Sequence, residues 1–421
     1  MDLLAARGQM AMSLGFHILF AVAGIAMPVL MAVAEWRHLK TGDAMYLELA
    51  KRWARGTAIL FAVGAVSGTV LSFELGLLWP TFMRHAGPII GMPFSLEGFA
   101  FFLEAIFIGI YLYGWNRMRP RLHLWAGVVV ALCGALSGIF VVAVNAWMNA
   151  PTGFTLVDGQ LTDIHPLQVF ASPAFPSQAL HMTFAAYAAI GFLAAGIHAW
   201  ALLRTPGSRF HTLALGIALG MAVVAVPLQL FTGDLAGKHI AEFQPVKLAA
   251  AERHFETRAD APITAFGLVE IPYGLSMLAY NDPHAVVRGL EDFPESDWPP
   301  ITIVHVAFEI MVGCGSAMFG VVLWVIFRVV RKKKVAASRP LLWACVFAAP
   351  LGMIAIEAGW TVTEVGRQPW IIHGVMRTAE AVTPMPGLIV PFLTFSILYL
   401  VLGVIVVVLL RAHVFAAGDL G

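Results

Sequence analysis

Glu364-Val365-Gly366-Arg367-Gln368-Pro369-Trp370 closes a strongly apolar segment that also contains Trp360. The stretch places a carboxylate and a guanidinium three residues apart at the boundary of a predicted membrane span. Ionisable groups at such depth are costly and usually belong to a cofactor, an ion path or a buried pair. The stretch therefore marks a functional site at one face of a membrane protein.

Composition places the whole chain in the class of polytopic α-helical membrane proteins. Of its 421 residues, 59% are hydrophobic and 12% are charged, far more apolar surface than a globular core needs. The net charge of +1 gives no reason to expect nucleic-acid binding. Three cysteines lie inside apolar runs, so no disulfide framework is expected. No CxxCH motif is present for a covalently attached haem.

Hydropathy predicts an all-α fold of nine transmembrane helices. Each apolar segment can cover a hydrocarbon core of about 30 Å at about 1.5 Å per residue. No internal repeat of the kind found in inverted-repeat transporters stands out. The predicted spans cover residues 10–34, 56–78, 94–115, 122–148, 178–203, 211–231, 300–327, 341–360 and 387–410.

Positive charge predicts the orientation of these spans. Most of the 26 lysines and arginines fall in the segments that share a side with the connection between the first two spans. Because cytoplasmic segments carry such an excess, we expect a periplasmic N-terminus and a cytoplasmic C-terminus. The chain then divides into residues 1–231 with six spans, a long periplasmic segment 232–299, and residues 300–421 with three. A connection of that length is usually functional or mobile.

Three candidate haem ligands lie in the outer halves of their spans. His181 and Met311 would offer an imidazole and a thioether, which together make a low-spin haem site. His17 lies in the first span, where a single histidine is more often a hydrogen-bonded packing residue than a ligand. Methionine is also a common gap filler, so Met311 alone is a weak signal.

Glu97 and Glu104 lie seven residues apart, and so on one face of the third span. They would serve either as carboxyls bonded to a neighbouring helix or as a proton relay or weak haem ligand. Ser137 and Asn145 in the next span could extend such a path or form interhelical hydrogen bonds.

Lys247 and Glu252 lie in the long outer segment. The simplest interpretation is a surface salt bridge. The functional alternative is that the cation and the carboxylate bind a quinol headgroup and take its proton.

Together these residues resemble subunit I of the cytochrome bd-type quinol oxidases. The matching motifs follow one order along nearly the whole chain, and the segment ending at Trp370 is the most distinctive. They are Gly15-Phe16-His17, Leu96-Glu97-Gly98, Phe101-Phe102-Leu103-Glu104, Asn145-Ala146-Trp147-Met148, His181, Lys247–Glu252, Ile310-Met311-Val312 and Glu357-Ala358-Gly359-Trp360 through Trp370.

The resemblance implies three haems near the outer face. His181 and Met311 would ligate haem b558, which takes electrons from quinol. His17 and Glu364 would ligate the two high-spin haems, b595 and d, with the assignment between them left open. Glu97 would be a further ligand or near neighbour of haem d.

Two more residues of the distinctive segment take roles by the same resemblance. Trp360 would lie between haems, and Arg367 would pair with haem propionates. Lys247 and Glu252 fall in the equivalent of the quinol loop, here in its short form.

The function implied is that of a terminal respiratory oxidase in the bacterial inner membrane. Quinol would be oxidised at the outer face, and protons for water would come from the cytoplasm through residues such as Glu104. Charge would thus be separated without a proton pump. The family also implies a second large subunit, often a single-span small subunit, and contact with membrane lipid.

Two positions depart from the better-known members of the family. Glu309 stands where they carry arginine, and Ala105 follows Glu104 where serine is common. With the short loop, these departures leave open a cyanide-insensitive branch in which a further haem b replaces haem d.

Three rival functions fit the sequence less well. A haem-copper oxidase needs adjacent histidines, and the chain has no His-His pair. A dihaem cytochrome b needs histidine pairs within helices, and only His181 and His198 offer one. A proton-coupled transporter would use Glu97, Glu104 and Glu357, and would carry no haem.

Overall fold

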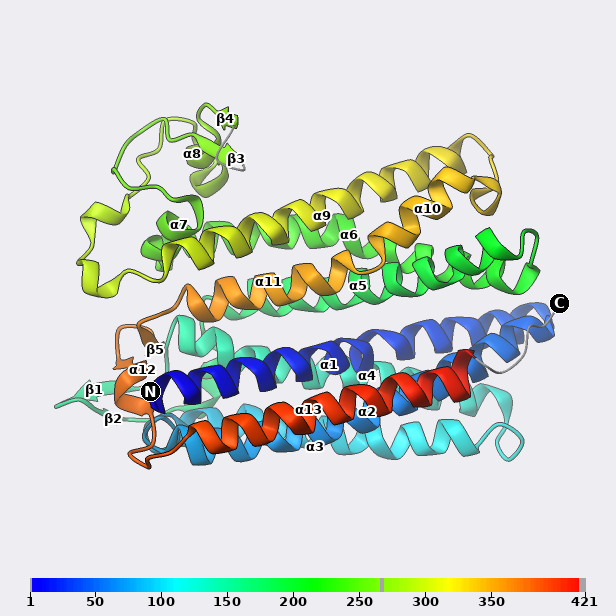
Figure 1. The fold of residues 1–421 in the computed structure, drawn as a ribbon, viewed down its shortest axis with the longest axis horizontal. Coiled ribbons are helices and arrows are strands. Elements are labelled where there is room, and N and C mark those ends of the chain that lie inside the picture. The colour runs from blue at the N-terminus through cyan, green and yellow to red at the C-terminus, as the bar shows by residue number, and fades with distance from the viewer. Residues whose placement is uncertain (1, 266–268, 416–421) are drawn as a thin grey trace.

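The computed structural model describes residues 2–265 and 269–415, and within them it confirms an all-α membrane fold. Nine helical segments there are long and apolar enough to span a membrane (Figure 1). They are α1 (Asp2–Thr41), α2 (Ala44–Leu78), α3 (Pro80–Tyr113), α4 (Pro120–Asn149), α5 (Phe175–Arg204), α6 (Arg209–Phe243), α9 (Ile301–Val330), α10 (Arg339–Ala348) with α11 (Leu351–Val365), and α13 (Ile389–Leu410), which continues as a π turn, Arg411–Phe415.

The long helices form two groups that meet at α1, α4 and α5. In the first group, α1 packs against α2 and α4, α3 packs against α4, and α13 lies on α1 and α2. In the second, α5 packs against α6 and α10, and α9 packs against α11. Contacts of α1 and α4 with α5 join the groups, and both groups run along the same axis in Figure 1.

Small residues allow the close approach of helices in the second group. A Cβ added to Gly352 of α11 would lie 2.4 Å from the Cα atom of Ala189 on α5. Any side chain at this position would force the two helices apart. Small residues at such crossings are typical of membrane helices, which gain their association from close packing rather than from a hydrophobic effect.

Most helices extend beyond the predicted spans, and two further differences change the course of the chain. The span expected over 341–360 consists of α10 and α11, which are separated at Ala349 and Pro350. Proline has no backbone N–H to continue the helical hydrogen bonds of the preceding turn. The sixth span continues to Phe243, so the long connection expected from residue 232 begins about three turns later.

The connection after α6 is partly structured. It contains α7 (Pro245–Glu252), the hairpin of β3 (Ile263–Ala265) and β4 (Val269–Ile271), and α8 (Gly274–Tyr280). We call the end of the molecule that carries it the loop end, and the N-terminus lies there too (Figure 1). The other short elements are β1 (Thr155–Val157) with β2 (Gln160–Thr162), β5 (Trp370–Ile372) with β6 (Met376–Arg377), α12 (Thr378–Ala381), and 3-10 turns at Pro166–Ala171, Leu290–Asp292, Glu295–Asp297 and Val335–Ala337.

Candidate haem and quinol site

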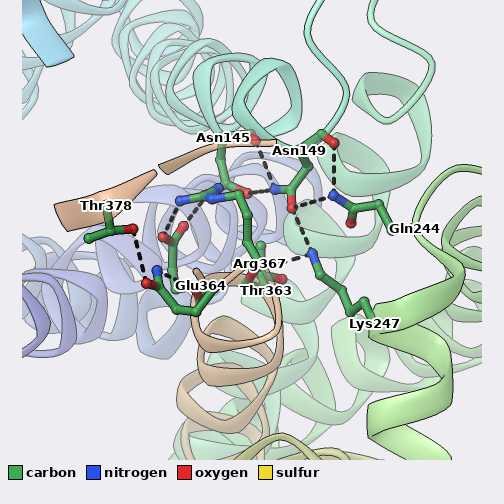
Figure 2. A network of polar contacts seen from close by, with 9 residues as sticks. Asn145, Asn149, Gln244, Lys247, Thr363, Glu364, Arg367 and Thr378 are labelled. Carbon is green, nitrogen blue, oxygen red and sulfur yellow. Dashed lines mark hydrogen bonds and ion pairs between the residues drawn. The ribbon is translucent and has the colours of Figure 1, made fainter. Parts of the chain in front are cut away.

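A buried polar network at the loop end contains the carboxylate and the guanidinium of the opening motif. Glu364 lies in the last turn of α11, where Asn145 of α4 donates to its Oε1 atom. Arg367 donates from Nη2 to Oε2 of Glu364 at 2.5 Å. Figure 2 shows the two donors converging on this carboxylate from different segments.

Arg367 is buried with hydrogen-bond donors that have no partner among the described residues. Its side chain is 2% exposed, yet its Nε and Nη1 atoms have no hydrogen-bond partner among the described residues. A guanidinium carries five N–H donors, and a buried one is stable only when acceptors surround it. These orphaned donors fit an anionic group such as a haem propionate.

The same network continues to Lys247 through Asn149, which donates from Nδ2 to Oδ1 of Asn145 at 3.0 Å. Lys247 of α7 donates from Nζ to Oδ1 of Asn149 at 2.6 Å and to the Thr363 carbonyl at 3.3 Å. Gln244 donates to the Asn149 carbonyl at 2.7 Å. Sequence reasoning missed Asn149 and Gln244, although Asn149 lies one helical turn after Asn145.

Lys247 is therefore not the surface residue of the simplest interpretation. It is 3% exposed and makes no ion pair with Glu252 among the contacts of the described residues. Burial holds the pKa of Lys247 well below its usual value, Arg367 lowers it further, and Glu364 opposes the shift. A lysine in this setting is readily left neutral and donates hydrogen bonds to a polar ligand.

Glu252 ends the same helix, α7, and its charged neighbour is Glu309 of α9. It is 9% exposed, and burial together with the nearby Glu309 carboxylate raises its pKa to about 7. His305 of α9 links α9 to α7: its Nδ1 atom lies 2.7 Å from the Ala251 carbonyl, and its Nε2 atom lies 3.5 Å from Glu309. The Glu252 carboxyl can thus exchange a proton near neutral pH.

The three candidate haem ligands each face a glycine of a neighbouring helix. A Cβ on Gly68 would lie 3.0 Å from the His17 ring, and one on Gly233 would lie 3.1 Å from the His181 ring. A Cβ on Gly359 would lie 3.0 Å from the Met311 sulfur. The glycines leave room beside each ligand that any other side chain would take.

Neighbouring hydroxyl and amide groups orient the two imidazoles. The Nδ1 atom of His17 lies 3.0 Å from the Ser67 hydroxyl. The Nε2 atom of His181 lies 3.0 Å from the Gln229 amide, and its Nδ1 atom lies 3.4 Å from Thr232. A ligating histidine usually hydrogen-bonds through the nitrogen that does not bind the metal. His17 matches this pattern, whereas ligation by His181 would replace one of its two contacts.

A cavity of about 670 Å³ lies between α9 and α11. Its lining is apolar except for Glu357 and two threonines, and Leu19 of α1 closes one side. The Oε1 atom of Glu357 is buried without a hydrogen-bond partner among the described residues. Trp360 follows on the same helix and packs at the edge of the main core.

Glu97 and Glu104 both meet α4. Glu97 accepts a hydrogen bond from Ser137 at 3.1 Å, as one of the two interpretations expected. Glu104 is 3% exposed and packs between Gly24 of α1 and Gly134 of α4. Its Oε1 atom has no partner among the described side chains. The two carboxyls lie along one interface between α3 and α4.

Over nearly its whole length, the chain is similar to known subunits of cytochrome bd oxidases. The family model described as cytochrome bd terminal oxidase subunit I matches residues 5–417. A Bacillus subtilis protein named as a candidate cytochrome bd menaquinol oxidase subunit I is 36% identical over 97% of this chain and 96% of its own length. The B. subtilis cytochrome bd ubiquinol oxidase subunit 1 is 31% identical over 97% and 92%. The structure of the bd oxidase from Geobacillus thermodenitrificans matches with a TM-score of 0.94 at 40% identity, covering 99% of both chains.

Proposed function

The chain belongs to the cytochrome bd terminal oxidase subunit I family, and from this premise we propose which of its residues hold haem, bind quinol and carry protons. As a member it is a multi-pass membrane subunit of a haem-containing quinol oxidase. It works with subunit II and couples quinol oxidation to oxygen reduction in the bacterial inner membrane.

The haem assignment rests on the space and the unpaired groups around the candidate ligands. His181 and Met311 would hold haem b558, and His17 and Glu364 would hold the two high-spin haems, b595 and d or a further haem b. Glu97 would lie beside one of the high-spin haems. When bound, the haems supply electron transfer and the iron at which oxygen is reduced. Arg367 would neutralise propionates with the donors that the protein leaves unpaired.

The quinol site would lie where α7 meets α11. Lys247 reaches both Asn149 and the Thr363 carbonyl, one residue before Glu364. This position would let its ammonium or amine hold a quinol oxygen close to the proposed haem site. Glu252, whose pKa is about 7, would take a proton from the quinol and release it at the loop end.

Protons for the reduction of oxygen would enter from the side opposite to the loop end. Glu97 and Glu104 line the α3–α4 interface, with Ser137 bonded to Glu97. Proton entry from the cytoplasm and release outside would separate charge without a pump. This sidedness agrees with the lysine and arginine distribution, which favours a periplasmic N-terminus and a cytoplasmic C-terminus. A single-span small subunit would complete the complex.

A reduced-minus-oxidised spectrum of the complex with subunit II tests the proposed cofactors. We expect b-type bands together with a long-wavelength chlorin band, and quinol-driven oxygen uptake. If only b-type bands appear while uptake persists, a further haem b replaces haem d. A complex without haem bands would contradict the haem assignment and favour a transporter role for Glu97 and Glu104.

The pH dependence of quinol oxidation tests Glu252. The carboxyl must be ionised to accept a proton, so activity should be present above its pKa of about 7 and lost as the pH falls through it. We expect kcat/KM for quinol to rise between about pH 6 and 8. Glu252→Gln should remove this rise and lower kcat/KM at pH 8 at least about tenfold.

Glu256→Gln is the matched control, because Glu256 lies four residues further on the same connection and is exposed. It should keep the wild-type pH profile. Glu309 of α9 is the charged neighbour of Glu252, and His305 of α9 contacts the adjacent Ala251 carbonyl; neither residue is altered in either variant. An unchanged profile in Glu252→Gln would exclude this carboxyl as the proton acceptor.

A further inference from the structure

The hairpin of β5 and β6 places Arg377 against Trp370, the last residue of the opening motif. The two residues pair across the hairpin, and directly opposite residues of an antiparallel pair lie on the same face. The guanidinium carbon of Arg377 lies 4.6 Å from the centroid of the Trp370 ring. Gly374 in the turn has a φ of +71°, a left-handed conformation that glycine adopts readily. The turn thus fixes the register that brings the cation onto the ring.

Arg377 also binds the far end of the connection between α6 and α9. It donates from Nη2 to Oδ1 of Asp297 at 2.5 Å and from Nη1 to the Ser296 carbonyl at 3.1 Å. Both acceptors belong to the 3-10 turn Glu295–Asp297, shortly before α9 begins at Ile301. One side chain therefore joins the hairpin to a segment 80 residues earlier in the chain.

The segment that contains this turn packs against α7, which carries the proposed quinol ligands. Trp298 follows the turn directly and packs on an apolar cluster that includes Ala250 of α7 and Val362 of α11. Lys247 and Glu252 both lie on the same short helix, α7. Because the turn and α7 belong to one packed unit, a displacement of the turn would also displace the proposed quinol ligands.

His373 of the hairpin shows that these segments lie close to the proposed quinol site. The pKa of His373 is lowered to about 4, and burial is the main cause. The charges of Lys247 and Arg367 act in the same direction, whereas Asp297 opposes them. All three charges therefore lie close enough to act on one imidazole. Because His373 is neutral near pH 7, Arg377 is the cation that pairs with Asp297.

An ion pair at the surface usually contributes little, but Arg377 forms more than a pair. Its side chain is 35% exposed, and that of Asp297 is 29% exposed. The carboxylate, the Ser296 carbonyl and the Trp370 ring hold the guanidinium in one orientation, so one ordered side chain serves three contacts. The arginine therefore forms a fixed link between the two segments.

We propose that Arg377 is a positioning residue for quinol binding, which holds the end of the connection, and with it α7, against the motif segment. It contacts Asp297 and Trp370, and it acts on quinol through Lys247 and Glu252 of α7. The proposal rests on the proposed quinol site. Without Arg377 the connection would separate from the hairpin, so quinol would bind less tightly. The proposed haem ligands lie on the spans, so haem content would not change.

Quinol oxidation by the intact oxidase complex tests the proposal, with a short-chain ubiquinol or menaquinol as the probe. Arg377→Ala should raise KM for the quinol about tenfold and change kcat less than about twofold, because only binding interactions are lost. The reduced-minus-oxidised spectrum should keep all its haem bands. Arg377→Lys keeps the charge without the planar fork of donors, so its KM should lie between those of the wild type and Arg377→Ala.

Asp297→Ala shows whether the ion pair carries the effect. It should raise KM in the same direction, and the double variant Arg377→Ala with Asp297→Ala should exceed Arg377→Ala by less than about twofold. Residues that share one contact have effects that do not add. Additive effects of the two substitutions would overturn the proposal, as would a loss of haem bands in either variant.

Arg288→Ala is the matched control. Arg288 pairs with Asp292 at 3.6 Å, and its guanidinium carbon lies 4.2 Å from the centroid of the Phe293 ring. Its contacts resemble those of Arg377, but both partners lie within the connection itself. This variant should keep the wild-type KM. An equal rise of KM in Arg288→Ala and Arg377→Ala would contradict a specific role for the link to the hairpin.

Lys247→Ala distinguishes a failure of this proposal from a failure of the proposed quinol site. If Lys247→Ala raises KM and Arg377→Ala does not, the quinol site stands and Arg377 does not position it. If neither variant raises KM, the quinol site itself is wrong and the proposal fails with it. A rise of KM in both variants, with haem bands and kcat kept in Arg377→Ala, is the expected result.

Discussion

Replacement of His181 by alanine is expected to remove the low-spin haem signal and to lower quinol-driven oxygen uptake at least about 100-fold. Loss of an outer-shell partner already costs about 10- to 100-fold in metal affinity, and His181 is proposed as a direct ligand. Its ring is held by Gln229 and Thr232 and faces the space beside Gly233. The measurements are the reduced-minus-oxidised spectrum and oxygen uptake of the purified complex.

His198→Gln is the control for this experiment, because His198 is a second buried histidine on the same helix. Its Nδ1 atom lies 2.9 Å from Nδ1 of His211, near the opposite end of the molecule. The variant should keep all haem bands. If His198→Gln loses haem as His181→Ala does, a dihaem arrangement on α5 is correct and the Met311 assignment is wrong.

The sequence was sufficient to predict the spans because hydropathy reports burial in lipid directly. It could not predict where the helices end. α1 extends to Asp2 and Thr41, well beyond the apolar segment 10–34, because hydrogen bonding and packing continue the helix into polar sequence. The break between α10 and α11 depends on Pro350 and on close packing of Gly352 against α5, and only the proline can be seen in the sequence.

Candidate site residues could be predicted where they are ionisable and lie in an apolar segment. Asn149 and Gln244 could not, because neutral amides occur at many helix ends and only the fold brings them to Lys247. Glu74 was missed for another reason. It is buried and accepts hydrogen bonds from Gln9 and Ser13 of α1, but no second carboxyl marks its helical face in the sequence.

Glu104→Gln is expected to lower the turnover number about 100-fold with haem content unchanged. Positioned groups that transfer protons typically contribute about 10²- to 10⁴-fold, and glutamine keeps the shape of glutamate but cannot carry a proton. The side chain lies between Gly24 and Gly134, where the amide fits the same space. Oxygen uptake at saturating quinol and the haem-to-protein ratio are the measurements.

Glu48→Gln and Glu104→Asp are the controls for this experiment. Glu48 is a half-exposed carboxyl on α2, 3.7 Å from Arg55, and its loss should leave turnover unchanged. Aspartate at position 104 keeps a titratable group one methylene shorter, so it should retain more turnover than glutamine. If the aspartate and glutamine variants lose turnover equally, the role of Glu104 is to pack α3 against α1 and α4. A relay role instead predicts a larger loss in the glutamine variant, because only a carboxyl can carry a proton. The surrounding helices offer Oε1 of Glu104 no hydrogen-bond partner among the described residues.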